Sequence, residues 1–220
     1  TNGTFTNFVM NNGNTSKGET WKAQVWINDG TANSTLVNTT ELLILNSNTT
    51  IPTLDSPIND TYVNNRTPQF FIINADDSDP EDQIYYRLEV SDAFSFSSMN
   101  YSNGTIRKVV NTTNGHNITT SLADSVYYWK ARATDLSTNS SYTEIRNFTI
   151  DATPPVNLTL LSPSNGTTAS NRTPLLIWSN VSDVNFVNYT IEIDDDVDFS
   201  SIQFTFVNAN NASNSTLQLT

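Results

Sequence analysis

The chain has 220 residues, of which 36% are hydrophobic, and its 22 acidic and 10 basic residues give a formal net charge of −12. This length can hold one large domain or two repeats of about 100 residues, with enough apolar side chains for ordinary sandwich cores. The few basic residues form no stripe that could neutralise phosphates, which excludes nucleic acid as a partner. The lack of cysteine excludes disulfides and thiolate metal sites. No run of 18 apolar residues occurs, so we expect no membrane insertion within this segment.

The first recognisable element lies near residue 21. Residues 21–29, Trp-Lys-Ala followed by an Asn-Asp pair, echo residues 129–135, Trp-Lys-Ala followed by Thr-Asp. In the second copy this strand comes late in its unit, whereas Trp21 has only 20 residues before it. Residues 1–50 are therefore predicted to be the C-terminal half of an Ig-like sandwich.

The second unit is defined by a repeat. Residues 53–68 match residues 159–174 at a constant spacing of 106, which includes the shared Asn-Arg-Thr-Pro. Pro52, Pro154 and Pro155 mark its limits, because proline stiffens a connector and does not continue a central strand. Residues 51–153 are thus predicted to form a complete domain, and stiff connectors favour a rod-like arrangement. Strands are expected at 69–74, 84–90, 126–133 and 144–150, where β-prone runs lie between turn-rich stretches.

The strand at 126–133 carries the clearest alternation. Its odd positions, Tyr127, Trp129, Ala131 and Ala133, share one face, and Lys130 lies on the other. Trp129 should therefore be a core residue.

The last unit begins like the second and is predicted to be the N-terminal part of a further domain, residues 154–220. Tyr189-x-x-Glu192 and Phe199-Ser-Ser repeat Tyr86-x-x-Glu89 and Phe96-Ser-Ser at a spacing of 103. A Trp-Lys-Ala strand would be expected near position 235. A half sandwich exposes a core face and unpaired edges, so something must complete it. Either a longer chain continues the array, or residues 1–50 of a neighbouring subunit complete residues 156–220.

Taken together, these motifs resemble the fibronectin type III-like and immunoglobulin-like tandem repeats of archaeal and bacterial cell-surface proteins. The shared pattern is Tyr-x-x-Glu, Phe-Ser-Ser, Tyr-Tyr-Trp-x-x-Arg-Ala-x-Asp and a closing Phe-Thr-Ile at 148–150. The resemblance implies an all-β, seven-stranded Greek-key β-sandwich that serves as a spacer or scaffold.

N-glycosylation acceptors are unusually frequent. The sequence Asn-x-Ser/Thr, with x not proline, begins at 20 positions, whereas composition alone would give roughly eight. Proline confines the Thr of the two Asn-Arg-Thr-Pro sites, so Asn65 and Asn171 should be the emptiest. We expect N-linked glycans at the other positions: Asn2, Asn14, Asn33, Asn38, Asn48, Asn59, Asn100, Asn103, Asn111, Asn117, Asn139, Asn147, Asn157, Asn165, Asn180, Asn188, Asn211 and Asn214.

Two clusters of carboxylates lie in loops. Asp76, Asp77, Asp79 and Asp82 crowd the loop after residue 74, where they form either a calcium site or a solvated acidic loop. Residues 194–198 hold the second cluster, where a solvated acidic segment is favoured over a calcium site because consecutive acids on a strand should point to opposite faces. No other cofactor is expected.

No catalytic apparatus is recognisable, and we expect no enzyme. The single histidine, His116, lies in a turn-like Asn-Gly-His-Asn, and neither a nucleophile elbow nor a glycine-rich phosphate loop occurs. The sequence favours a structural repeat segment of a glycosylated extracellular filament, sheath or surface layer, located at the cell surface and assembled head-to-tail with copies of itself. The alternative is the stalk or binding module of an adhesin, which could use Tyr85, Phe94, Tyr101 and Tyr128 as an aromatic patch.

Overall fold

The computed structural model describes residues 9–10, 13–109, 114–208 and 216–218. Every regular element among these residues is a β-strand, which confirms the predicted all-β class. The chain divides into two compact units, Thr1–Ile150 and Asp151–Thr220. In this described part we find no helix of the length and apolarity that a membrane span requires.

The N-terminal hairpin, which we define as residues 18–45, is a long antiparallel ribbon. Its strands are β1 (Thr20–Trp21) paired with β4 (Leu42–Leu43), and β2 (Gln24–Val25) paired with β3 (Val37–Asn38). No second sheet covers it among the described residues. Its apolar side chains are consequently solvent-exposed, with Trp26 at 53% and Leu45 at 73% exposure.

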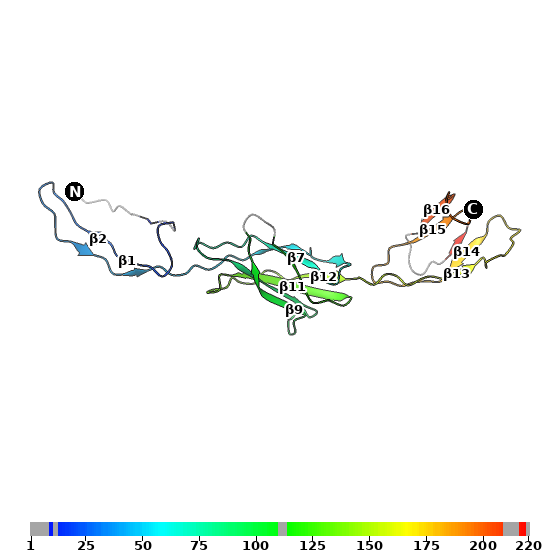
Figure 1. Ribbon diagram of the computed structural model, residues 1–220, viewed down its shortest axis with the longest axis horizontal. Helices are drawn as coiled ribbons and strands as arrows, with labels where there is room; N and C mark the ends of the chain where they lie inside the picture. Colours follow the sequence, from blue (N-terminus) through cyan, green and yellow to red (C-terminus); the bar gives the residue numbers. More distant parts are fainter. Residues whose placement is uncertain (1–8, 11–12, 110–113, 209–215, 219–220) are drawn as a thin grey trace. The chain divides into compact units, whose positions relative to one another are not determined.

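The central sandwich contains eight described strands in two sheets (Figure 1). One sheet has the order β10-β7-β5 and the other has the order β6-β12-β11-β8-β9. This strand order is that of a fibronectin type III-like sandwich. The strands are β5 (Thr53–Ser56), β6 (Thr61–Val63), β7 (Gln69–Ile73), β8 (Tyr85–Ser91), β9 (Tyr101–Arg107), β10 (Asn114–Asn117), β11 (Ser125–Thr134) and β12 (Arg146–Ile150).

The core between the two sheets is built on Trp129. The four inward positions predicted for this strand, Tyr127, Trp129, Ala131 and Ala133, are all buried, which confirms its register. The Trp129 ring is 0% exposed and meets Phe70 of the opposite sheet edge-to-face at 4.9 Å between centroids. Such aromatic pairs add to the free energy gained from burial alone.

Three features of this sandwich differ from the sequence-based expectation. Residues 114–117 form β10 and not a turn, because they pair with β7 and place His116 opposite Phe70. Strand β9 was not expected, since its Ser, Asn and Gly have low strand propensity, yet pairing with β8 holds it. The structure describes eight strands in this sandwich, whereas the resemblance implies seven. The difference arises because the opening strand divides into β5 and β6, which join opposite sheets.

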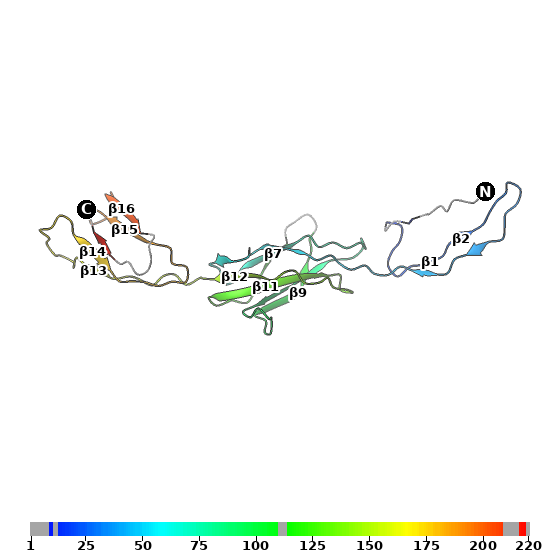
Figure 2. The ribbon, with the colours of Figure 1, turned by 180° about the vertical axis from the view of Figure 1, so that it is seen from behind.

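The second unit repeats the early strands of the central sandwich. It comprises β13 (Leu160–Ser162), β14 (Leu175–Trp178), β15 (Tyr189–Ile193), β16 (Phe204–Asn208) and β17 (Thr216–Gln218), with the sheet orders β13-β14-β17 and β15-β16 (Figure 2). The pairing of β13 with β14 has the same irregularity as the pairing of β5 with β7, shifted by 106 residues. Its small core holds the buried Trp178, Val181 and Tyr189.

Candidate functional site

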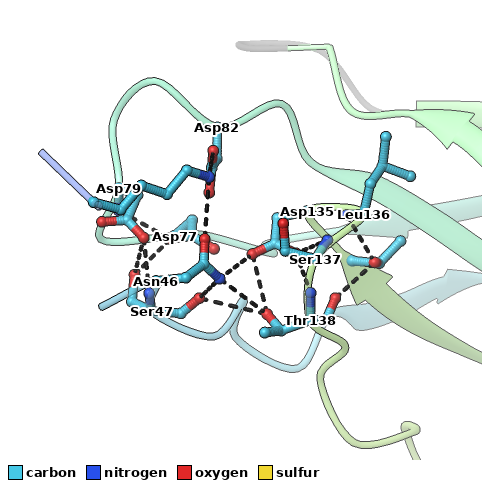
Figure 3. Close-up of polar contacts among 11 residues, drawn as sticks. Asn46, Ser47, Asp77, Asp79, Asp82, Asp135, Leu136, Ser137 and Thr138 are labelled. Carbon is cyan, nitrogen blue, oxygen red and sulfur yellow. Dashed lines mark hydrogen bonds and ion pairs between the residues drawn. The ribbon is translucent and has the colours of Figure 1, made fainter. Parts of the chain in front are cut away.

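Three segments meet at one end of the central sandwich in a polar cluster that we call the acidic junction (Figure 3). They are residues 46–50, which connect the N-terminal hairpin to β5, residues 75–82 between β7 and β8, and residues 135–138 after β11. The connector therefore contacts two loops that lie about 30 and 90 residues away in the sequence.

Ser47 attaches the connector to the loop after β7. Its backbone N–H donates to Asp79 Oδ2 at 2.8 Å, and its hydroxyl donates to Asp77 Oδ1 at 2.8 Å. Asp77 Oδ1 also accepts the Asp79 N–H at 2.9 Å, which shapes the loop into a tight turn. Three residues after Ser47, Thr50 exchanges hydrogen bonds with Asp76, since Thr50 N–H donates to the Asp76 carbonyl and Asp76 N–H donates to Thr50 Oγ1.

Asn46 attaches the connector to the loop after β11. Its side-chain amide donates to Asp135 Oδ2 at 2.7 Å, and Thr138 Oγ1 donates to the same oxygen at 3.0 Å. The other oxygen of Asp135 accepts the backbone N–H of Ser137 at 2.7 Å and of Thr138 at 2.5 Å. Both carboxylate oxygens are therefore fully engaged in a residue that is only 8% exposed.

These hydrogen bonds change the acidity of Asp135. Burial alone would raise the pKa of its carboxyl group, but hydrogen bonds from Asn46, Thr138 and Ser137 favour the charged form more strongly and hold the pKa at about 2. Asp135 consequently stays ionised across the physiological range and holds the connector in place.

Lys17 brings a positive charge to the junction from the N-terminal hairpin side. Its ammonium group pairs with Asp82 and donates to Asn46 Oδ1 at 3.0 Å. The hydrogen bond to Asp82 raises the pKa of Lys17, and its charge offsets part of the repulsion among the neighbouring carboxylates.

The structure brings together three of the four predicted metal-binding residues. Carboxylate oxygens of Asp77, Asp79 and Asp82 lie within 4.8 Å of one another, beside a hollow of about 380 Å³. The fourth, Asp76, is not part of this group; its side chain is 84% exposed and lies 3.8 Å from Lys108. Two oxygens, Asp77 Oδ2 and Asp82 Oδ2, are buried without a hydrogen-bond partner among the described residues.

The second acidic cluster corrects a sequence-based expectation. Consecutive acids were expected to diverge, but carboxylate oxygens of Asp194, Asp195 and Asp196 lie within 4.8 Å of one another. The reason is that β15 ends at Ile193, so these residues lie in a turn and do not alternate across a strand. Asp195 and Asp196 are exposed.

The predicted glycosylation sites lie at the surface wherever the structure describes them. Of the 20 acceptor asparagines, 16 are described and none is buried; Asn2, Asn111, Asn211 and Asn214 lie outside the described residues. Asn65 Oδ1 accepts both the N–H and the hydroxyl of Thr67, at 2.9 and 3.1 Å, and Asn103 Oδ1 accepts the same groups of Thr105. Asn171 repeats this arrangement with Thr173.

Three residues of the candidate aromatic patch, Phe94, Tyr101 and Tyr128, pack against other side chains. Phe94 packs edge-to-face on Tyr128, with 5.4 Å between ring centroids. Nearby, the Lys130 ammonium lies 4.0 Å above the centre of the Phe96 ring and 3.6 Å from Glu89, a carboxylate that is 4% exposed. His116 hydrogen-bonds Tyr101, and its burial lowers the pKa of the imidazole.

Sequence reasoning located the acidic loop but missed its partners Lys17, Asn46, Ser47 and Asp135. One signal was present, because the Asn-Asp pair at 28–29 repeats the Thr-Asp pair at 134–135. Asp29 Oδ1 accepts the N–H groups of Thr31 and Ala32, as Asp135 Oδ1 accepts those of Ser137 and Thr138. The repeat therefore marks a loop-shaping aspartate in both hairpins.

Comparison with known proteins gives a likeness of structure only. No family model matches the chain, and no curated protein is similar to it in sequence. Among solved structures, the chain is similar to the crystal structure of the chicken CNTN1 FN1–FN3 domains, at 10% sequence identity and a TM-score of 0.37, over 92% of this chain and 67% of that one.

Proposed function

We propose that this chain is a structural repeat segment of a glycosylated extracellular assembly, such as a filament, sheath or surface layer. The observation that carries this proposal is the placement of the acceptor asparagines, since none of the 16 described ones is buried. Glycans are bulky and hydrated, so they need exposed acceptors, and they protect polar sandwiches from edge-to-edge association.

The hydrogen-bonded connector agrees with a spacer role. Residues 46–50 are held to two loops of the central sandwich through Ser47 and Asn46. A connector that is fixed in this way transmits the position of one repeat to the next better than a flexible linker does.

Glycopeptide mapping of the native protein tests the proposal. We expect glycan mass at most of the acceptor positions, with Asn65 and Asn171 the least occupied. These two serve as internal controls, because proline follows the threonine of each acceptor sequence, at Pro68 and Pro174. Glycans at fewer than about a quarter of the acceptor positions would contradict a glycan coat.

The stalk or binding module of an adhesin is the competing function. A carbohydrate-binding module would need aromatic rings that are free to stack on a sugar. Here Phe94 and Tyr128 contact each other, and Tyr101 contacts His116. Glycan-array binding by the intact chain that is lost in Tyr128→Ala and kept in Tyr62→Ala, which changes an exposed tyrosine of β6, would favour this alternative.

Calcium binding at the acidic junction is a second proposal, favoured by one specific observation. Asp77 Oδ2 and Asp82 Oδ2 are buried carboxylate oxygens without partners among the described residues, and such oxygens are the ligands that calcium prefers. The Asn46 side-chain oxygen lies beside them and is bound by the Lys17 ammonium. A calcium ion would compete with Lys17 for the Asp82 carboxylate and the Asn46 side-chain oxygen.

Titration calorimetry and thermal unfolding of the full chain test the calcium proposal. We expect calcium to raise the melting temperature, Asp82→Asn to abolish this effect, and Lys17→Met to tighten binding. Asp195→Asn, in the exposed cluster of the second unit, is the matched control. A melting curve that is the same in calcium and in excess chelator would leave only a solvated acidic loop.

A further inference from the structure

The N-terminal hairpin has the same construction as the β11–β12 hairpin of the central sandwich. In both, a threonine exchanges hydrogen bonds with an alanine of the facing strand: Thr39 with Ala23, and Thr143 with Ala131. In both, an isolated bridge closes the tip, at Asn28–Asn33 and at Thr134–Asn139, a spacing of 106 residues. The hairpin at residues 18–45 is therefore a second copy of the pair of strands that supplies Trp129 to the central core.

The second unit has an open edge where such a hairpin belongs. In the central sandwich β8 has two neighbours, β9 and β11, whereas its counterpart β15 pairs only with β16 among the described strands. On the inner side of β15 lies an apolar groove of about 380 Å³, lined by Leu160, Leu176, Trp178, Ile191 and Ile193. Two strands of the central sandwich that correspond to these, β7 and β8, contact Trp129 through the Phe70 ring and through the pairing of β8 with β11.

We propose that the N-terminal hairpin of one copy of this chain pairs with β15 of a second copy and completes its sandwich. The central sandwich gives the register, because β11 pairs with β8 through Trp129–Val90, Lys130–Glu89 and Ala131–Leu88. Transferred to the equivalent residues, this register places Trp21 opposite Ile193, Lys22 opposite Glu192 and Ala23 opposite Ile191.

Charge supports this register. In the central sandwich Lys130 lies 3.6 Å from Glu89, and the proposed contact sets Lys22 against Glu192 in the same way. Both residues are available, because Lys22 is 58% exposed in its pair with Glu41 and Glu192 is exposed. A one-residue shift would separate these charges and turn Trp21 away from the groove.

The distribution of glycosylation acceptors agrees with the proposed contact. Within the central sandwich, β8 and β11 contain no acceptor asparagine, whereas their other neighbours in the sheet, β9 and β12, contain Asn103 and Asn147. Their proposed counterparts, β15 at residues 189–193 and the first strand of the N-terminal hairpin at residues 18–28, contain none either. The two strands that would pair are thus free of acceptor asparagines, and the hairpin's own acceptors, Asn33 and Asn38, lie at its tip and in β3.

Disulfide trapping tests this contact in the full chain, which contains no natural cysteine. One chain carries Ala23→Cys and another carries Ile191→Cys, and facing residues in a sheet lie within the Cα separation that a disulfide needs. We expect a linked heterodimer when the two chains are mixed. The matched control, Thr190→Cys with Ala23→Cys, differs by one residue and should link at least tenfold less.

Charge reversal provides the second arm. Lys22→Glu should weaken association of the full chain in sedimentation experiments, and Lys22→Glu mixed with Glu192→Lys should restore it. No heterodimer on mixing, or a link that forms only within a doubly substituted single chain, would overturn the inference. The inference rests on the proposed assembly role, but glycopeptide mapping is independent of it: a glycosylated chain that stays monomeric overturns the contact alone.

Discussion

The central sandwich and the second unit share their strand registers and differ in their burial. Strands β5 and β7 pair as β13 and β14 do, with the same irregularity. Yet the central core buries Trp129, Tyr86, Phe70 and Phe148 completely, whereas the core of the second unit, in the part that the structure describes, is built on three buried residues and borders an apolar groove. Local sequence therefore sets which strands pair, but a dry core requires both sheets to be complete.

The largest expected effect separates the two cores. Trp129→Ala should lower the free energy of unfolding by about 3–5 kcal/mol, because the ring is fully buried against Phe70 and leaves a cavity. Trp178→Ala should lower it by less, since its buried ring packs on Tyr189 but also lines an open groove, so fewer packing contacts are lost. Denaturant unfolding followed by circular dichroism measures both. Equal losses would mean that the second unit is as tightly packed as the first.

Two equivalent glutamates sharpen the comparison. Glu89 accepts hydrogen bonds from Tyr142 at 2.6 Å and Arg87 at 2.8 Å and is 4% exposed. Glu89→Gln should therefore cost about 1.5–3 kcal/mol, as removal of hydrogen bonds to a charged group does. Glu192→Gln should change the stability of the dilute chain by less than about 0.5 kcal/mol, because Glu192 is exposed. Matching unfolding midpoints for the two variants would contradict this difference.

The acidic junction should give the central unit a specific dependence on pH. The pKa of Asp135 is lowered to about 2 from an ordinary value of 3.8, so its charged form stabilises the folded state above about pH 4. This stabilisation, about 1–2 kcal/mol, should disappear as the pH falls from 4 to 2. Asp135→Asn should be less stable than the unchanged chain at pH 7 and equal to it near pH 2. A difference that persists at pH 2 would assign the loss to packing.

The smallest expected effect concerns the hairpin surface. Lys22→Ala should change the stability of the dilute chain by less than about 0.5 kcal/mol, because the pair with Glu41 is exposed on both sides. The equivalent Lys130→Ala should cost more, since Lys130 lies over the rings of Phe96 and Tyr142 and is 19% exposed. Thermal unfolding of both variants is sufficient to rank them.

The strands that could be predicted from the sequence are those whose apolar residues alternate. Trp129 and its neighbours in β11 were found in this way, and their burial confirms it. β10 could not be found, because Asn-Gly-His-Asn has the composition of a turn and becomes a strand only by pairing with β7. The acidic loop was visible as a run of aspartates. Its partners Asn46 and Asp135 were not, because tertiary contacts across about 90 residues leave no local pattern.

The division of the opening strand gives the central sandwich a mechanical property. Strand β6 runs parallel to β12, and Thr61, Tyr62 and Val63 pair with Phe148, Thr149 and Ile150. Tension that pulls the chain from both sides draws β6 toward its start and β12 toward its end, so the two strands are loaded in shear along their length. Their hydrogen bonds must then break together, and the bond from Asp60 N–H to the Asn147 carbonyl extends the loaded stretch. Because resistance to force depends on the unfolding rate, this sandwich should yield slowly when it is stretched between its neighbours.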